Sequence, residues 1–148
     1  MNEINIRSTT INNISSILPL MSQLGYPSSL EELTTRFKKF INNDGYGVAV
    51  ATLNNGVVGV IAWSKSMLFV SDKIRIHVEA LVIDENYRGQ KIGKRLMEYL
   101  EEKAKKHNQV LVDLTSSYRR AKDGTHAFYE NLGYKSSESA GAYFRKEL

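Results

Sequence analysis

Residues 81–96 of the 148-residue chain are LVIDENYRGQKIGKRL, a β-rich segment that leads through a glycine-containing loop directly into an amphipathic helix. At such a junction successive backbone N–H groups converge with the positive end of the helix dipole, so the site favours phosphate groups. Lys94 and Arg95 would oppose the dipole in an empty site, whereas a bound polyanion makes their charges favourable. The alternative is a helix start with solvated cations and no ligand, and this segment alone leaves both interpretations open.

Hydrophobic periodicity predicts the elements around this junction. Asn54, Asn55 and Gly56 predict a short antiparallel hairpin turn. Ser28 or Ser29 is expected to cap the second helix. The predicted strands cover residues 4–6, 46–53, 57–65, 74–83, 110–114, 134–135 and 142–146, and the predicted helices cover residues 11–21, 30–40, 92–106 and 127–132, the last of which ends at Gly133.

Residues 74–83, 92–106 and 110–114 form a strand, a helix and a strand, which predicts a right-handed crossover between two parallel strands. Residues 110–114 are nearly all apolar, as in a strand buried on both faces. We therefore expect a single α/β domain over residues 1–148. Its central mixed sheet is mostly antiparallel, with helices on both faces and one parallel pair that splays apart beyond Ile83. Such sheets bind ligands at the carboxyl ends of their strands.

Composition excludes several classes of protein. Hydrophobic residues make up 42% and charged residues 24% of the chain, which argues against a disordered or fibrous protein. The chain has no cysteine, so disulfides, thiol nucleophiles and thiolate metal sites are excluded. The longest apolar run, residues 57–63, is too short to span a membrane, and the first residues lack a signal-peptide pattern, so we expect a soluble cytoplasmic protein. The net charge of +4 favours an anionic partner.

Two better-known phosphate loops do not fit the sequence. A P-loop requires GxxxxGK followed by Ser or Thr, but the spacing from Gly89 to Gly93 is one residue short, and Arg95 stands at the hydroxyl position. Residues 45–47 begin a GxGxxG pattern, but Val50 occupies the third glycine position. The three histidines are scattered without metal-ligand spacing, so no metal is expected.

Two motifs resemble the GNAT superfamily of N-acetyltransferases. The family's cofactor loop consists of Arg or Gln, two residues, Gly, one residue, then Gly or Ala, which Arg88 and Gly93 match. Lys91 stands where the family usually has glycine, so its amide must adopt the glycine geometry with a side chain attached. Residues 126–134, HAFYENLGY, resemble the family's AHxFYExxGF helix and turn, with Thr125 in place of the common alanine. Together with the order of strands and helices, the motifs extend the resemblance over nearly the whole chain.

The resemblance implies a site for acetyl-CoA as co-substrate, with no metal. The pantetheine chain is expected along residues 74–83, hydrogen-bonded to the backbone of Leu81 and Ile83, with the pyrophosphate in the following loop. From the residues alone, Phe128 is ordinary core, because it lies four positions before Leu132. The residues implied in cofactor binding are Leu81, Val82, Ile83, Arg88, Gly89, Gln90, Lys91, Ile92, Gly93, Lys94 and Phe128.

Glu79 is the candidate general base. It is expected on the same side of its strand as Leu81 and Ile83, at a position where similar enzymes often carry a glutamate that removes a proton from the amine, usually through water. The alternative role is an outward-facing carboxylate paired with Arg75 or Lys73. The sequence leaves both roles open.

Tyr129 is the candidate general acid. The resemblance places its hydroxyl beside the thioester sulfur, where a neutral phenol can protonate a departing thiolate. The alternative is a partly buried tyrosine whose hydroxyl is a polar handle. Among the histidines, His77 could substitute for Glu79, although a strand histidine is more often packed or on the surface. His126 is implied to be structural, and His107 is expected to be exposed at a helix end.

The implied reaction is direct acetyl transfer from acetyl-CoA to a primary amine of a small molecule or peptide. A backbone N–H near Leu81 would hold the oxyanion. The expected acceptor walls are residues 24–30, the strand around Trp63 and residues 136–143, which could admit an amino acid, a polyamine, an aminoglycoside or a peptide. The alternative is a non-catalytic acyl-CoA-binding or nucleic-acid-binding module. The basic stretch 103–106 lacks interleaved aromatic residues, so we expect neither nucleic acid nor a membrane as partner, while a homodimer is compatible with the sequence.

Overall fold

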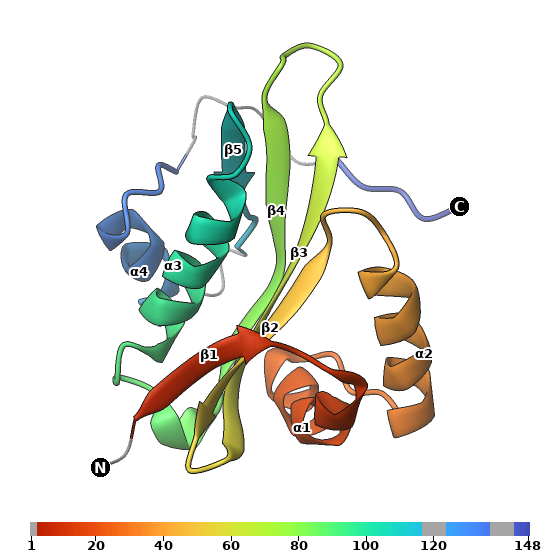
Figure 1. The fold of residues 1–148 in the computed structure, drawn as a ribbon, viewed down its shortest axis with the longest axis vertical. Helices are drawn as coiled ribbons and strands as arrows, with labels where there is room; N and C mark the ends of the chain where they lie inside the picture. The colour runs from red at the N-terminus through yellow and green to blue at the C-terminus, as the bar shows by residue number, and fades with distance from the viewer. Residues whose placement is uncertain (1–2, 117–123, 137–143) are drawn as a thin grey trace. The chain divides into compact units, whose positions relative to one another are not determined.

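The computed structural model describes residues 3–116, 124–136 and 144–148. The chain divides into two compact units, Met1–Leu114 and Thr115–Leu148. Within the described residues, the sheet and its helices belong to the first unit, and α4 belongs to the second. The elements in Figure 1 are β1 (Ile4–Ser8), η1 (Ile11–Asn13), α1 (Ile14–Leu24), α2 (Leu30–Ile41), β2 (Gly47–Leu53), β3 (Gly56–Met67), β4 (Ile74–Ile83), η2 (Glu85–Tyr87), α3 (Ile92–Ala104), β5 (Val110–Asp113) and α4 (Thr125–Asn131).

The five strands form one sheet in chain order, from β1 to β5. The first four strands pair antiparallel and β4 pairs parallel with β5, which confirms the predicted mixed sheet. The β2–β3 hairpin turns at Asn54 and Asn55, whose φ angles are 51° and 67°. Positive φ at both central residues is the geometry of a type I′ turn, which asparagine tolerates and which matches the twist of the two strands.

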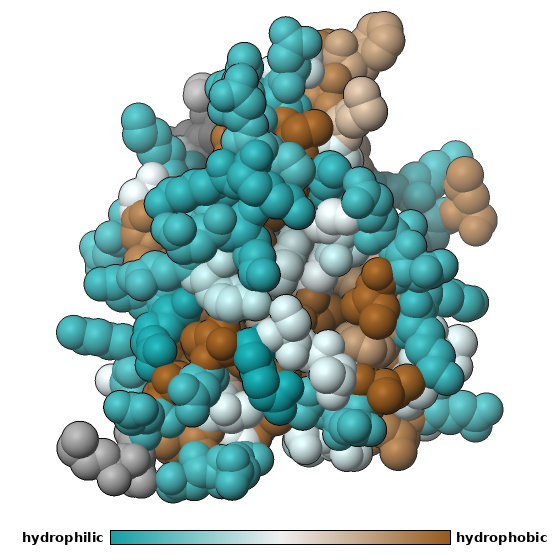
Figure 2. Space-filling view, in the orientation of Figure 1, coloured by the Kyte–Doolittle hydropathy of each residue, from teal (hydrophilic) through white to brown (hydrophobic). Residues whose placement is uncertain are grey.

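Helices cover both faces of this sheet. Val60 is buried in one core cluster with Ile17 of α1 and Phe37 of α2. Gly59, the neighbour of Val60 along β3, faces the opposite side, where an added Cβ would lie 3.1 Å from a methyl group of Leu96 in α3. Figure 1 shows α1 and α2 on one side of the sheet and α3 on the other. Figure 2 shows hydrophilic side chains on the outer surface of α3.

A capping box starts α2 on the first of these faces. The Ser29 hydroxyl accepts the N–H of Glu32 at 3.1 Å, and the Glu32 carboxylate accepts the N–H of Ser29 at 3.1 Å. Of the two candidate caps, the structure therefore uses Ser29. The hydrogen bond from the Ser29 side chain is the main cause that lowers the pKa of Glu32. The two reciprocal bonds satisfy N–H groups that the helix itself leaves unpaired.

A β-bulge interrupts β4. Ala62 pairs with Ala80 and Trp63 pairs with Val78, so Glu79 is an extra residue in β4 opposite β3. A bulge reverses the alternation of side chains beyond it and bends the strand. Side-chain directions before and after Glu79 therefore cannot be read from a simple period of two.

The parallel strands part within β4. Their pairing ends at His77 and Asp113, whereas β4 continues to Ile83. The expectation that they splay only beyond Ile83 is wrong, because β5 is a short strand that ends at Asp113. The expectation of a strand buried on both faces is also wrong, since Leu111 is 40% exposed. An apolar run indicates a strand but does not decide whether both faces are covered.

In the second unit, α4 is followed by Gly133 with φ of 91°, the left-handed conformation that favours glycine after a helix. This helix and its glycine end were predicted. Residues 134–136 and 144–148 form no strand, so the strand expected at 134–135 and the described part of the one expected at 142–146 are wrong. Residues 142–143 lie outside the described residues. Segments this short specify no strand without a partner.

Candidate active site

Hydrogen bonds from β3 and α1 hold the start of the loop that follows β4. The carboxylate of Asp84 accepts the N–H of Asn86 at 3.0 Å, and the N–H of Asp84 donates to the carbonyl of Val58 at 2.8 Å. The side-chain oxygen of Gln23 in α1 accepts the N–H of Glu85 at 3.0 Å. These bonds fix where the chain leaves the carboxyl end of β4, and so where the predicted phosphate loop begins.

Lys91 takes the backbone conformation that glycine favours. Its φ of 62° and ψ of 20° lie in the left-handed region, and Gly89 has a φ of 79°. A residue with a Cβ is disfavoured in that region by about 1–2 kcal/mol. The expectation that this position keeps a glycine geometry with a side chain attached is therefore confirmed.

The first amides of α3 are available to an anion. The helix has no side-chain cap and no acidic residue in its first turn. Its first internal bond is donated by the N–H of Arg95 to the carbonyl of Lys91 at 3.2 Å. The N–H groups of Ile92, Gly93 and Lys94 therefore have no partner within the helix and lie at the positive end of its dipole. The Ile92 side chain is buried at 1% exposed, so Ile92 can offer only its amide.

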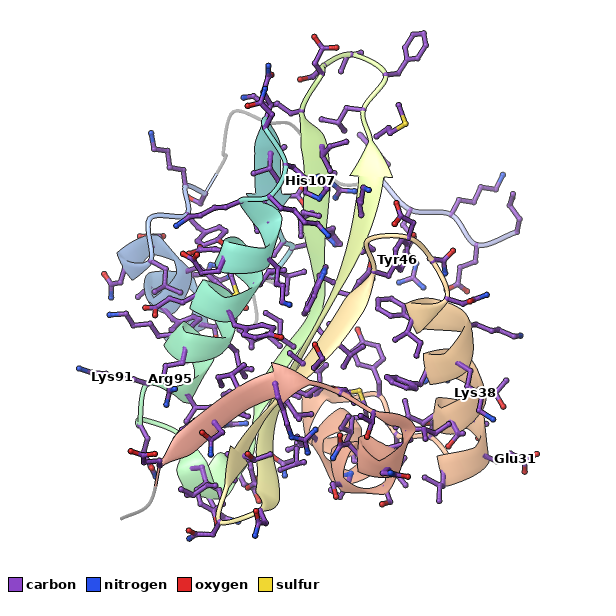
Figure 3. All side chains as sticks on the ribbon, viewed as in Figure 1. Glu31, Lys38, Tyr46, Lys91, Arg95 and His107 are labelled. Atoms are coloured by element: carbon purple, nitrogen blue, oxygen red, sulfur yellow. The ribbon has the colours of Figure 1, made fainter. Side chains whose placement is uncertain are left out.

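Most of the side chains around these amides face solvent. Arg88, Gly89, Gln90, Lys91 and Lys94 are exposed, and Gly93 is half-buried. Arg95, in contrast, donates from its guanidinium to the carbonyl of Ile4 in β1 at 2.7 Å. In Figure 3, Lys91 projects away from the loop, whereas Arg95 lies beside β1. The Arg95 guanidinium is thus held by a carbonyl distant in sequence, and whether its charge also attracts a bound anion stays a prediction.

Replacing Lys91 with glycine is expected to raise the free energy of unfolding by about 0.5–1 kcal/mol relative to Lys91→Ala. The reason is that the penalty on a Cβ in the left-handed region exceeds the extra chain entropy that glycine loses on folding. Both variants lose the same charge, so the difference between their free energies of unfolding reports the backbone conformation at residue 91. Urea unfolding of the two variants measures it, and equal stabilities would show that residue 91 is not left-handed in solution.

One edge of β4 is open beyond His77. Among the described residues, that part of β4 pairs with β3 only, so the backbone groups on its other edge are not used by a neighbouring strand. An extended ligand can pair with such an edge as an added strand does. Leu81 and Ile83 are half-buried along it. Val82 turns its side chain into the core under α1 and α2, so it can offer only its backbone.

Polar side chains gather on the face of the sheet that α1 and α2 cover. Ser64 is four residues after Val60 along β3 and so lies on the same face. Its hydroxyl donates to Oε1 of Glu79 at 2.6 Å. His77 pairs with Ser64 across the ladder and lies on this face too. The exposed Glu79 carboxylate is thus held beside a serine and a histidine on one surface.

The bulge overturns the expected direction of Glu79. Leu81 pairs with Ile61, and Ile83 packs near α3 against Gly59, so both side chains lie on the α3 face. Glu79 bonds to Ser64 on the other face. The expectation that Glu79 shares a side with Leu81 and Ile83 is wrong, because the extra residue reverses the alternation.

Arg75 and His77 both bind Asp113, the last residue of β5. Arg75 Nε lies 2.8 Å from Asp113 Oδ2, and His77 Nδ1 lies 2.7 Å from Asp113 Oδ1. The predicted alternative for Glu79, an ion pair with Arg75 or Lys73, is not found in the part of the chain that the structure describes. Asp113 was not predicted as a site residue, although a carboxylate at the carboxyl end of a parallel strand is a signal for one.

Trp63 does not line an acceptor site on that face. It neighbours Ser64 along β3 and therefore faces α3, where its ring is so close to Gly47 that an added Cβ would lie 2.3 Å from it. Only 8% of Trp63 is exposed. Of the other expected acceptor walls, residues 24–30 connect α1 to α2, whereas residues 137–143 lie outside the described residues.

Tyr129 and Phe128 lie in α4, in the second unit. The ring centroid of Tyr129 is 5.0 Å from that of Phe128 and 6.3 Å from that of Tyr134, with edge-to-face geometry. The N–H of Tyr134 donates to the carbonyl of Tyr129 at 3.1 Å. Phe128 and Tyr129 are both half-buried. Because Tyr134 follows α4, the turn after the helix packs against the Tyr129 ring.

The remaining titratable cluster lies at the other end of α3. His107 is half-buried rather than exposed as expected, and burial, followed by the charges of Lys65 and Lys106, lowers the pKa of His107. Lys65 donates to Asp44 at 3.0 Å, which lowers the pKa of Asp44. Among the described residues, no group of three His, Asp or Glu side chains could hold a metal ion. None of the described helices is long and apolar enough to cross a membrane.

A mixed sheet whose parallel strands part beside a strand–loop–helix junction is the architecture that the sequence motifs imply. Residues 44–136 match the family described as Acetyltransferase (GNAT) domain. The chain therefore belongs to the GNAT acetyltransferase family, which confirms the resemblance.

The chain is also similar to individual proteins and solved structures. The aminoalkylphosphonate N-acetyltransferase of Salmonella typhimurium is 32% identical over 88 residues, which cover 60% of this chain and only 56% of that protein. A GNAT family acetyltransferase structure from Staphylococcus aureus is 26% identical, covers 100% of both chains and has a TM-score of 0.80. The glucosamine-6-phosphate N-acetyltransferase from Arabidopsis thaliana is 21% identical, covers 97% and 99% of the two chains, and shares the fold with a TM-score of 0.81.

Proposed function

We propose that the chain is a single-domain enzyme that transfers the acetyl group of acetyl-CoA to the primary amine of a small molecule or peptide. The observation that carries the proposal is the phosphate-type loop, with a left-handed Lys91 and three amides at the start of α3 that have no partner within the helix. Converging N–H groups at a helix start favour a pyrophosphate. We choose acetyl-CoA over other phosphate-bearing ligands because the chain belongs to the GNAT acetyltransferase family.

In this proposal, the open edge of β4 binds the pantetheine part of the cofactor, and the loop after β4 binds the pyrophosphate. Leu81, Val82 and Ile83 bind the pantetheine chain through their backbone, as a strand partner would. The exposed ammonium of Lys94, which lies 3.9 Å from the Glu98 carboxylate, belongs to the first turn of α3 and adds a screened attraction. Phe128 contributes apolar contact. The pyrophosphate is bound by Arg88, Gly89, Gln90, Lys91, Ile92, Gly93 and Lys94.

Acetyl-CoA supplies the acetyl group as a thioester that an amine can attack. Glu79, or a water that it orients, accepts a proton from the acceptor ammonium, which frees the amine lone pair. A backbone N–H near Leu81 stabilises the negative charge on the carbonyl oxygen. The hydroxyl of Tyr129 donates a proton to the departing sulfur. Glu79 and Tyr129 thus each transfer one proton, and the backbone N–H stabilises the oxyanion.

The acceptor class is the finer part of the proposal. The curated relative from Salmonella typhimurium is named for aminoalkylphosphonates, and the Arabidopsis thaliana structure is named for glucosamine-6-phosphate. Small amines that carry an anionic group are therefore the first acceptors to try on this chain. Neutral amines, polyamines and peptides complete the panel.

The test is release of free thiol from acetyl-CoA with each member of that amine panel. We expect thiol release that depends on at least one primary amine and on enzyme concentration. If CoA binds but no amine accelerates thiol release above the rate without amine, the chain is an acyl-CoA-binding module instead. A parallel filter-binding experiment with nucleic acid tests the other alternative.

Glu79→Gln is expected to lower kcat/KM for the amine by about 10²-fold at neutral pH, because the amide cannot accept the ammonium proton. Much of the defect should disappear at high pH, where the amine is already neutral. The measurement is the pH profile of kcat/KM. Glu102→Gln, which changes an exposed carboxylate on α3, is the control and should keep the parent profile. An unchanged profile in Glu79→Gln would assign Glu79 a structural role.

A further inference from the structure

A cluster of His77, Asp113 and Arg75 sits where β4 and β5 part. His77 and Asp113 form the last pair of the parallel ladder. Their side chains meet at 2.7 Å, and Arg75 reaches the second oxygen of Asp113 at 2.8 Å. The side chains of Asp113 and Arg75 are about one-third exposed, and that of His77 is 19% exposed. The cluster is thus a part-buried network that borders the open edge of β4.

The chemistry of the three groups determines which ring nitrogen of His77 carries a proton. An ionised carboxylate only accepts hydrogen bonds, so His77 Nδ1 must donate to Asp113. Arg75 donates to the same carboxylate in a charge-assisted bond. Arg75 also approaches Nδ1 to 3.0 Å, but a protonated Nδ1 has no lone pair to offer. When the ring is neutral, its only lone pair is therefore on Nε2.

The His77 side chain lies on the face that carries the proposed general base. His77 pairs with Ser64 across the ladder, and the Ser64 hydroxyl binds Glu79. Both proton-accepting side chains therefore flank one serine on the surface that α1 and α2 share. An aspartate that holds a histidine as its Nδ1–H tautomer is the arrangement that turns Nε2 into a base.

We propose that His77 is a second proton acceptor for the amine and that Asp113, held by Arg75, is its positioning residue. Glu79 takes the proton of the ammonium before attack, and His77 takes the second proton, which the nitrogen loses after it has bonded to the acetyl carbon: that N–H bond breaks, its electron pair stays on the nitrogen, and an Nε2–H bond forms on His77, directly or through one water. The imidazolium then returns the proton to solvent. The inference rests on the proposed function and adds a residue pair to its site.

A double-mutant cycle tests the positioning role. Asp113→Asn and His77→Gln are each expected to lower kcat/KM for the amine by about 10-fold, with the KM for acetyl-CoA unchanged. If Asp113 acts through His77, adding Asp113→Asn to His77→Gln has no further effect. Asp72→Asn, which changes an exposed aspartate between β3 and β4, is the matched control and should keep the parent rate. Additive losses, or a parent rate in Asp113→Asn, would overturn the proposal.

A spectroscopic measurement on the same proteins needs no substrate. NMR of the isotopically labelled imidazole nitrogens, at a pH where the ring is neutral, is expected to report the Nδ1–H tautomer of His77 in the parent. In Asp113→Asn the amide can donate to Nδ1, so the Nε2–H tautomer should rise. An Nε2–H tautomer in the parent overturns the proposal even if Asp113→Asn fails to fold. A parent with this tautomer but no amine-dependent turnover would contradict the proposed function instead.

Discussion

Tyr129→Phe is expected to lower kcat by about 10²- to 10⁴-fold while the affinity for acetyl-CoA stays nearly unchanged. The substitution removes the hydroxyl that is proposed to protonate the leaving sulfur. It keeps the ring, and with it the edge-to-face contacts to Phe128 and Tyr134 at 5.0 and 6.3 Å. Steady-state kinetics combined with calorimetric binding separates the chemical step from cofactor binding.

Tyr99→Phe is the matched control for this prediction. It likewise deletes only a tyrosine hydroxyl, but on α3 facing β1, where the Tyr99 and Ser8 hydroxyls lie 3.1 Å apart. Its kcat should equal that of the parent. Equal activity in Tyr129→Phe and the parent would remove Tyr129 from the mechanism, whereas a loss in both variants would point to a general effect on stability.

Gly93→Glu is expected to abolish CoA binding in calorimetry. Gly93 lies in the first turn of α3, between amides proposed to bind the pyrophosphate. A side chain there would block close approach of a phosphate, and a carboxylate would repel its charge. The parent should bind CoA and acetyl-CoA with similar affinity, because acetylation leaves the phosphates untouched. Added salt should weaken both, since Lys91 and Lys94 contribute a screened attraction.

Lys103→Glu is the control for Gly93→Glu. It lies on the same helix near the opposite end, where its ammonium sits 5.3 Å from the centre of the Tyr99 ring. This variant changes the net charge more than Gly93→Glu does, yet it should bind CoA like the parent. Melting curves must show that both variants are folded. If Gly93→Glu binds CoA as tightly as the parent, the phosphate site lies elsewhere.

Local signals in the sequence predicted most of the sheet. The β2–β3 turn follows from two asparagines that tolerate positive φ, and β4 was predicted with its observed bounds, Ile74–Ile83. The strand–helix–strand pattern also predicted that β4 and β5 are parallel. Even the left-handed conformation of Lys91 was expected from its place in the motif.

The misplaced features depend on contacts between distant residues. No local sequence pattern predicts the bulge at Glu79. The bulge turns the Glu79 carboxylate toward Ser64 rather than to the side of Leu81. Arg95 binds a carbonyl of β1, and His77 meets Asp113 only because the parallel register places them together. Pairing partners and register depend on tertiary contacts. A single sequence therefore predicts which residues are candidates for the site better than it predicts where their side chains point.

The most direct test of the central claim follows the acetyl group itself. The parent protein is mixed with acetyl-CoA whose acetyl carbonyl is isotopically labelled, together with the amine that gives the fastest thiol release. NMR then reports the chemical form of the label. The account predicts that the label moves from thioester to amide in equal amount to the free thiol formed. A label that stays in the thioester, or that appears as free acetate at the same rate without amine, would contradict N-acetyl transfer by this protein.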